Sequence, residues 1–195
     1  MSFLLGDQIG ADFYTGNGHK WMCGPKGAAF LHVRRDHHAA LDAPVVSWGY
    51  VAQMAGRTGF DAYTGTGTLQ RRLQWQGTRD LSAWLALPAA IEFQKRHDWA
   101  TVRARCHEMA VQALHRLRSR WGLPPISADE DLAQMAPIPV PHQDAEALRR
   151  RLFEDSGIEV PVTQHAGRTF VRLSVQGYTT ARDIDALMNA PALQP

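Results

Sequence analysis

The stretch of sequence that decides the fold reads Gly16-Asn-Gly-His-Lys20-Trp-Met-Cys-Gly-Pro-Lys-Gly27. A β-prone run at 11–15 precedes it, and an apolar run at 28–33, typical of a buried strand, follows it. A lysine in a tight turn between two such strands is expected to be partly withdrawn from water, which favours the neutral, nucleophilic amine. Lys20 is therefore a candidate to form a Schiff base with a carbonyl cofactor. Taken alone, the pattern also suits a surface lysine, which is our interpretation of Lys26.

A second polar segment, Trp75-Gln-Gly-Thr-Arg-Asp80, comes directly before a predicted helix. Backbone N–H groups and a threonine hydroxyl at a helix N-terminus form a binding site for an anion, and phosphate is the natural guest. Thr78 is the candidate for that contact; the alternative is that Thr78 or Asp80 only caps the helix. Pro88 lies inside the apolar pattern of this helix and is expected to kink it.

A third segment, Phe170-Val-Arg-Leu-Ser-Val-Gln-Gly-Tyr178, places an arginine inside an apolar strand pattern. Arg172 must either extend its head into solvent or pair with an anion. The planar guanidinium suits a carboxylate in bidentate geometry. Both interpretations of Arg172 remain open from the pattern alone.

The chain is predicted to divide where the composition changes, near His97-Asp98. We expect a long loop region at 44–70 and no internal repeat. After the boundary, a 3.6-residue apolar period predicts a helix over 99–121. The predicted later elements are an edge strand at 135–140, a helix at 145–153, strands at 158–163 and 169–175, and a short helix that begins with a capping box at Thr180.

Composition excludes several classes of protein. The 195 residues are 45% hydrophobic and 21% charged, as in an ordinary globular protein. A net charge of +2 gives no electrostatic reason to expect nucleic acid or a membrane as partner, and no apolar run is long enough to span a bilayer. With only two cysteines, we expect no disulfide framework and a cytoplasmic location.

The three segments together resemble those of the class V aminotransferases, a fold-type-I group of pyridoxal-phosphate (PLP) enzymes, and above all their isopenicillin N epimerase-like branch. The resemblance rests on Tyr14-Thr-Gly-Asn-Gly-His-Lys20-Trp, on Trp75 to Asp80 and on Arg172 to Tyr178, in the family's order. It covers nearly the whole chain. It implies an α/β fold: part of the large PLP-binding domain over 1–97, then a small α+β C-terminal domain over 98–195.

The resemblance also implies roles for five residues. Lys20 would form the Schiff base with PLP and shuttle the proton at Cα of the substrate. His19 and Asn17 would lie near the cofactor, although many relatives have Ser where Asn17 stands. Thr78 would reach the cofactor phosphate, typically across a homodimer interface, and Arg172 would grip the α-carboxylate of a small amino-acid-like substrate.

The family's pyridinium-binding aspartate lies in an Asp-x-Ala-His strand before the lysine, and its main phosphate loop lies earlier still. The resemblance therefore implies that the chain corresponds to the C-terminal half of such an enzyme. We expect the intact enzyme to act as an isomerase or transferase, and the isolated chain to bind PLP weakly and to be inactive.

Several alternative functions remain open. On the same scaffold the chemistry could be epimerisation, β-elimination or transamination, and the chain could instead be a non-catalytic remnant or a subunit completed by a separate N-terminal half. A cysteine desulfurase is disfavoured, because it needs a thiolate shortly before the carboxylate arginine and no cysteine lies between Gly157 and Arg172. Cys106 falls on the core face of the predicted helix. No metal-ligand spacing and no dinucleotide fingerprint is present, so neither a metal nor a dinucleotide cofactor is predicted.

Overall fold

A computed structural model describes residues 10–47, 67–142 and 144–195. The chain divides into two compact units, residues 1–97 and residues 98–195. The division falls at the position where the composition of the sequence changes. Each unit has its own secondary structure and is described separately. None of the described helices is long and apolar enough to cross a membrane.

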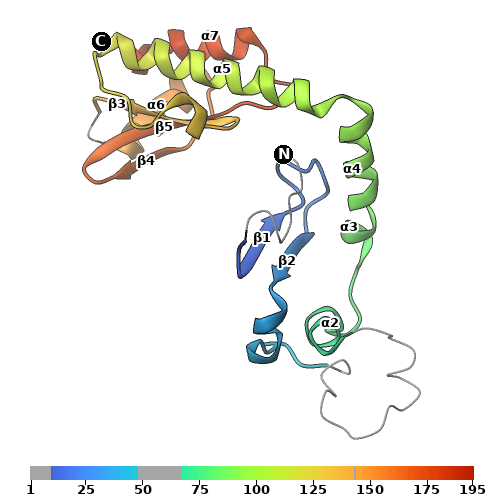
Figure 1. Ribbon diagram of the computed structural model, residues 1–195. Coiled ribbons are helices and arrows are strands. Elements are labelled where there is room, and N and C mark those ends of the chain that lie inside the picture. Colours follow the sequence, from blue (N-terminus) through green and yellow to red (C-terminus); the bar gives the residue numbers. More distant parts are fainter. Residues whose placement is uncertain (1–9, 48–66, 143) are drawn as a thin grey trace, which may run out of the picture. The chain divides into compact units, whose positions relative to one another are not determined.

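In the first unit, strands β1 (Phe13–Asn17) and β2 (Ala29–Val33) pair antiparallel, with Phe13 opposite Val33 and Asn17 opposite Ala29 (Figure 1). The first strand therefore runs two residues past its predicted end, because Gly16 and Asn17 still pair across the sheet. The prediction of a buried second strand is wrong. Val33 is buried but Leu31, two residues earlier on the same face of β2, is 52% exposed, so the cover of that face is confined to the end of the strand.

The sequence predicted one helix in the first unit, and the described residues form three short ones, the first of which begins inside the loop region predicted at 44–70. Residues 48–66 of that predicted loop lie outside the described part of the chain. The three helices are α2 (Thr68–Gln74), α3 (Ser82–Leu85) and α4 (Leu87–Arg96), with a 3-10 helix over Arg35–Ala40. The predicted single helix is broken at Ala86, and Pro88 lies in the first turn of α4, where its missing N–H costs no hydrogen bond. Asp80 accepts hydrogen bonds from the hydroxyl and the backbone N–H of Ser82, which hold the pKa of its carboxyl below the usual value.

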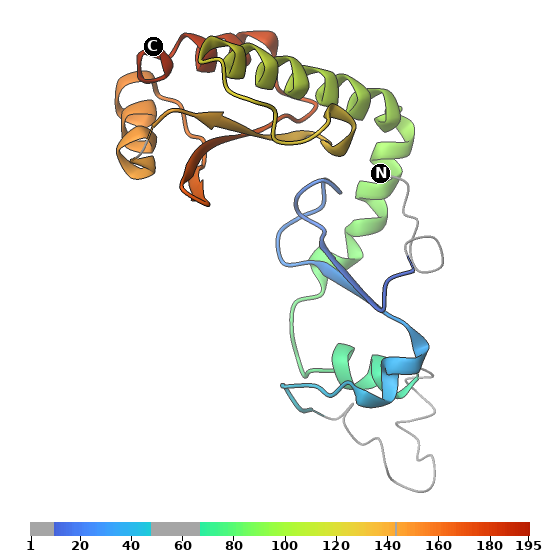
Figure 2. The same cartoon turned by 60° about the vertical axis from the view of Figure 1, so that its left-hand side comes forward.

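The second unit is an α+β fold. Its sheet has the order β3-β5-β4 and is antiparallel throughout, so β3 is an edge strand as predicted. Helices α5 and α7 lie along one face of this sheet (Figure 2). The elements are α5 (Trp99–Arg120), a 3-10 helix (Asp129–Asp131), β3 (Met135–Val140), α6 (Ala145–Ser156), β4 (Val162–His165), β5 (Arg168–Ser174), α7 (Ala181–Asn189) and a final 3-10 helix (Pro191–Leu193).

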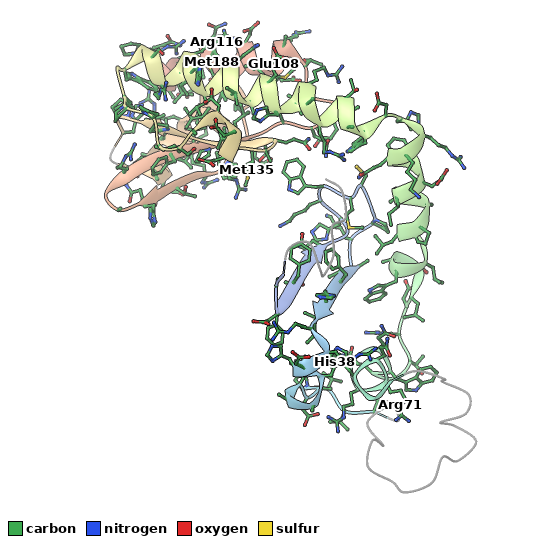
Figure 3. All side chains as sticks on the ribbon, in the orientation of Figure 1. His38, Arg71, Glu108, Arg116, Met135 and Met188 are labelled. Carbon is green, nitrogen blue, oxygen red and sulfur yellow. The ribbon has the colours of Figure 1, made fainter. Side chains whose placement is uncertain are left out.

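The core of the second unit forms where the apolar face of α5 meets the sheet. The core members Cys106, Ala110, Ala113, Leu114, Leu117, Ile138, Val171 and Leu173 belong to one buried cluster. Met188 of α7 is buried in the same cluster, whereas Met135 at the start of β3 and the α5 residues Glu108 and Arg116 are exposed (Figure 3). The predicted core position of Cys106 is therefore confirmed, and burial raises the pKa of its thiol.

The start of α7 and the start of β4 were both predicted from the sequence, and the structure confirms the first and corrects the second. The capping box at Thr180 is confirmed, since its side chain accepts from the Asp183 N–H and the Asp183 carboxylate accepts from the Thr180 N–H. The strand predicted at 158–163 starts only at Val162. Gly157 adopts the left-handed conformation that ends α6, and the Ile158 N–H closes the helix on the Leu152 carbonyl instead of joining the sheet.

His142 lies two residues after the end of β3 and forms a hydrogen bond with the backbone of Ala192 in the C-terminal segment. Its ring meets the Trp121 ring edge-on at 6.2 Å. The Nε2 atom is shielded from solvent and has no hydrogen-bond partner among the described residues. Burial, together with the positive charge of Arg151, lowers the pKa of His142.

We predict that the second unit loses stability in acid through His142. Because its pKa is lower in the folded than in the unfolded chain, its contribution is complete above the unfolded value of about 6.5 and is lost as the pH falls through the folded value. Urea unfolding followed from about pH 7 to about pH 5 should show a falling midpoint that flattens in His142→Phe. His165→Phe, at an exposed histidine, is the control. Equal pH slopes for wild type and His142→Phe would contradict this.

Candidate functional site

Lys20 lies in a loop that leaves β1 and returns to β2, closed at its base by backbone hydrogen bonds. The Gly18 N–H donates to the Ala28 carbonyl, and the Gly24 N–H donates to the Gly18 carbonyl, each at 2.8 Å. Within the loop, the Cys23 N–H donates to the Lys20 carbonyl at 3.1 Å. The turn that carries Lys20 is therefore pinned at both ends by the two strands.

The base of the loop requires glycine for steric reasons. A Cβ on Gly24 would lie 2.6 Å from Cδ2 of Leu87 and 2.8 Å from the Gly18 carbonyl oxygen. A Cβ on Gly18 would lie 2.7 Å from the same leucine methyl. Leu87 is the first residue of α4, so the helix packs directly on the backbone of the loop. Close approach of backbone to a neighbouring element is a common structural use of glycine.

Three of the five predicted site residues lie within four positions of one another in the sequence, at the end of β1 and in the loop that follows it. Asn17, the last residue of β1, is followed within three positions by His19 and Lys20, and all three are exposed. We predicted that the Lys20 side chain is partly withdrawn from water. This prediction is wrong, because none of the described residues buries it. Lys20 lies in the turn beyond the last strand pair, where neither strand covers it. Lys26, in the second turn of the loop, is exposed as expected.

Thr78 does not lie at a helix N-terminus, which corrects the prediction. The nearest helix, α3, begins at Ser82 and is a single turn of four residues. Thr78 is exposed in the connection after α2. The conformation of this connection is fixed by Arg79, whose guanidinium donates to the Gln76 side chain and the Gln74 carbonyl and lies 4.8 Å from the Trp84 ring.

Arg172 lies in the middle of β5, in the second unit. Its neighbours Val171 and Leu173 face the core, so the arginine falls on the other face of the sheet and is exposed. The period of two along the strand thus explains the cation inside an apolar pattern. Its N–H donates to the Pro161 carbonyl at 2.9 Å, and within the described part of the chain its guanidinium has no hydrogen bond or ion pair.

Gln94 and Arg79 are site residues that sequence reasoning missed. The Gln94 side chain donates to the Trp21 carbonyl at 2.8 Å, which ties α4 to the residue after Lys20. One signal was available. Gln94 follows Leu87 by seven residues, which is two helical turns, so both belong to the same face of α4.

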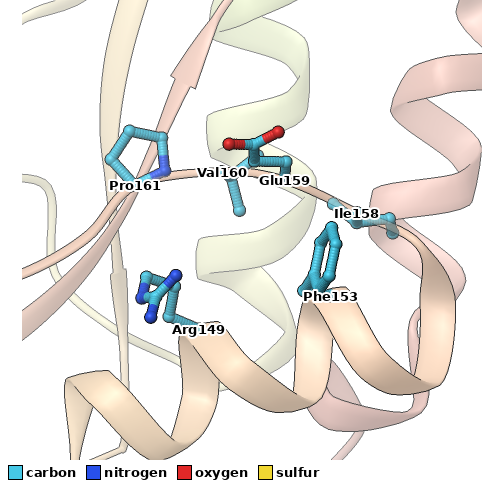
Figure 4. Close-up of a pocket in the computed structure, with 6 residues that line it drawn as sticks. All are labelled: Arg149, Phe153, Ile158, Glu159, Val160 and Pro161. Atoms are coloured by element: carbon cyan, nitrogen blue, oxygen red, sulfur yellow. The ribbon is translucent and has the colours of Figure 1, made fainter.

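A separate cavity of about 500 Å³ lies in the second unit; none of the predicted site residues lines it, although the Arg172 N–H donates to the carbonyl of its lining residue Pro161. Figure 4 shows Arg149 and Phe153 of α6 facing the extended segment 158–161. Arg149 already forms a two-bond ion pair with Glu146, so it is not a vacant anion receptor. Over residues 10–47, 67–142 and 144–195, no group of three His, Cys, Asp or Glu side chains is placed to hold a metal ion.

Comparison with known proteins identifies the family. The profile of the family described as "Aminotransferase class-V" matches residues 6–187. This chain belongs to the class V aminotransferase family. It is 36% identical over 182 residues to an isopenicillin N epimerase of Amycolatopsis lactamdurans, covering 92% of this chain and 46% of that protein. It is 32% identical over 209 residues to a putative L-cysteine desulfhydrase of Oryza sativa, covering 93% of this chain and 40% of that protein.

Solved structures show the fold. A cysteine desulfurase from Thermococcus onnurineus superposes with a TM-score of 0.69 at 18% identity, over 93% of this chain and 46% of that one. The chain therefore has the fold of part of a fold-type-I PLP enzyme, as expected. It spans about half the length of the curated relatives it matches.

We predict that Gly24→Ala opens the loop that carries Lys20. The leucine methyl can move aside, but the Gly18 carbonyl is backbone held by the loop's own hydrogen bond, so overpacking should cost on the order of 1–3 kcal/mol. Amide exchange at Cys23 and Gly24 should accelerate by roughly tenfold or more. Gly67→Ala is the matched control, because its Cβ would meet only the flexible Gln70 side chain. Unchanged exchange in Gly24→Ala would contradict the steric argument.

Proposed function

We propose that this chain supplies the cofactor lysine and the carboxylate-binding arginine of a PLP-dependent enzyme that acts at Cα of a small amino-acid substrate. The observation that carries the proposal is the loop after β1, which exposes His19 and Lys20 on a base fixed by hydrogen bonds and glycine packing, with Asn17 at the end of the strand directly before it. Membership of the class V family supports it, because the family's enzymes are PLP-dependent.

The residues present fit the proposed cofactor by their chemistry. An exposed primary amine at Lys20 can condense with an aldehyde, and the loop that carries it is rigid at its base. Asn17 and His19 offer hydrogen-bond donors beside that amine, and the Thr78 hydroxyl offers another. These hydrogen-bond donors suit the phosphate of PLP.

The roles of the residues then divide as follows. When bound, PLP withdraws electrons from Cα of an amino acid and makes its proton removable. Lys20 Nζ would hold PLP through its aldehyde carbon, and the lysine amine would be the group that accepts the Cα proton and returns it. Asn17, His19 and Thr78 donate to the cofactor, with Thr78 acting within a homodimer. The Arg172 guanidinium binds the substrate α-carboxylate in bidentate geometry.

Epimerisation is the first candidate reaction. It requires only that the Cα proton be removed and returned on the other face, and the two isopenicillin N epimerases are each 36% identical to this chain. A lyase is the second candidate, because four relatives at 29–32% identity are named as L-cysteine desulfhydrases or putative or probable ones. Both candidates share Lys20 and Arg172 and differ in the fate of the substrate once its Cα proton has been lost.

A subunit completed by a separate N-terminal half is a third candidate. It is supported by the surface of the first unit, where both outer edges of the β1–β2 pair are unpaired among the described residues. Large apolar side chains are also exposed there, among them Phe13, Leu31 and Leu85. Unpaired edges and apolar patches are surfaces that other chains cover. For all three candidates we propose a cytoplasmic enzyme.

We predict that PLP labels Lys20 selectively. Borohydride reduction of the chain mixed with PLP, followed by peptide mapping, should place the label on Lys20 and leave Lys26 and Lys95 largely unlabelled. In Lys20→Arg the label should be lost, and in the control Lys26→Arg it should be retained. A label on Lys26, or spread evenly over the three lysines, would refute the assignment.

We predict that Arg172→Leu weakens binding of an amino acid to the PLP-loaded chain. Loss of a charge-assisted pair should raise the dissociation constant for L-alanine by roughly 10- to 100-fold in a calorimetric titration. Arg168→Leu is the matched control, because Arg168 lies on the same face of β5 and is stacked on Phe170 at 5.2 Å. Equal losses in both variants would show a general charge effect and overturn the role of Arg172.

A further inference from the structure

The Gln94 amide reaches the loop of Lys20 from a distant part of the chain. Its Nε2 donates to the Trp21 carbonyl at 2.8 Å and lies 3.8 Å from the Cys23 sulfur. Trp21 follows Lys20 directly, and the Cys23 N–H donates to the Lys20 carbonyl. One side chain on α4 therefore contacts two residues of the hydrogen-bonded turn that begins at Lys20, Trp21 within the turn and Cys23 at its end.

Leu87 supports the same loop one step closer to its base. Its methyl group packs on Gly18 and Gly24, whose backbone groups hydrogen-bond to each other at 2.8 Å. Leu87 and Gln94 lie two turns apart on one face of α4, with Ala90 buried between them. The helix thus holds the base of the loop by packing and its tip by a hydrogen bond.

The tip needs such support. Cys23 has a φ of 61°, a left-handed conformation that side chains with a Cβ rarely adopt. Gln94 contacts both the residue in this conformation and the carbonyl two positions before it. Without the amide, among the described residues, the tip would keep the hydrogen bond from the Cys23 N–H to the Lys20 carbonyl and the weak, long contact of the Cys23 thiol with the Trp21 carbonyl at 4.0 Å.

We propose that Gln94 is a positioning residue for Lys20. By fixing the peptide group after Trp21, it limits the directions in which the Lys20 Cα–Cβ bond can point, so that only the flexible stem of the lysine remains free to move. Leu87 packs against Gly18 and Gly24 at the base of the loop, so the base stays in place while the Gln94 hydrogen bond holds the tip. The inference rests on the proposed function for the role of Lys20, but the ordering of the loop by Gln94 does not depend on the cofactor.

The test uses the full chain with two variants. Gln94→Leu keeps most of the side-chain volume and removes the donor, and Gln94→Glu keeps the shape and places an acceptor against the Trp21 carbonyl. Gln112→Leu is the control, because Gln112 is also a helical glutamine whose amide donates to a nearby oxygen, that of Glu108 on the same helix. Two readouts are compared: amide exchange at Cys23 without cofactor, and the ratio of Lys20 to Lys26 labelling by PLP and borohydride.

Both Gln94 variants are expected to raise amide exchange at Cys23 and to lower the Lys20 to Lys26 labelling ratio by roughly five- to tenfold, the worth of one hydrogen bond, while Gln112→Leu changes neither. The ratio is the decisive readout, because general destabilisation would move the labelling of two lysines in one loop together. Unchanged exchange and ratio in both variants, or equal changes in the two lysines, would overturn the inference. Faster exchange in a chain whose wild type shows no selective label at Lys20 would instead refute the proposed function.

Discussion

The arrangement of the candidate site depends on the hydrogen bond from the Gly24 N–H to the Gly18 carbonyl. It closes the loop of Lys20 on itself, and the Gly18 N–H then joins the closed loop to the strand at Ala28. Because neither glycine has a Cβ, α4 can press Leu87 against this junction and bring Gln94 within reach of the loop's tip. The exposed lysine is therefore carried by a rigid backbone.

The sequence predicted those features whose cause is local. The 22-residue helix α5 follows from its apolar period, and the capping box at Thr180 follows from two side chains three positions apart. Features set by distant contacts were not predictable in this way. Leu31 lies in an apolar run that is typical of a buried strand, but its side chain is half exposed. Burial of a strand depends on which other elements cover the sheet, and these are distant in the sequence. Thr78 lacks its expected helix because Arg79 folds back on Gln74 and Gln76.

The two proposed functional groups are carried by different kinds of backbone. Lys20 is on a loop held by hydrogen bonds and packing, whereas Arg172 is on the middle strand of a sheet, with a buried core on the opposite face. Both heads are exposed, so each can meet a ligand without breaking an existing hydrogen bond or ion pair of the described residues. This combination of fixed backbone and free side chain is what a covalently held cofactor and a small anionic substrate require.

The most direct test of the central claim, that Lys20 Nζ is the group that reacts with the cofactor, is ¹⁵N NMR of the chain labelled at its three lysines. On addition of PLP, one side-chain nitrogen resonance should leave the amine region for the imine region, and this change should be absent in Lys20→Arg. A spectrum in which no resonance moves, or in which the same shift persists in Lys20→Arg, would contradict the account.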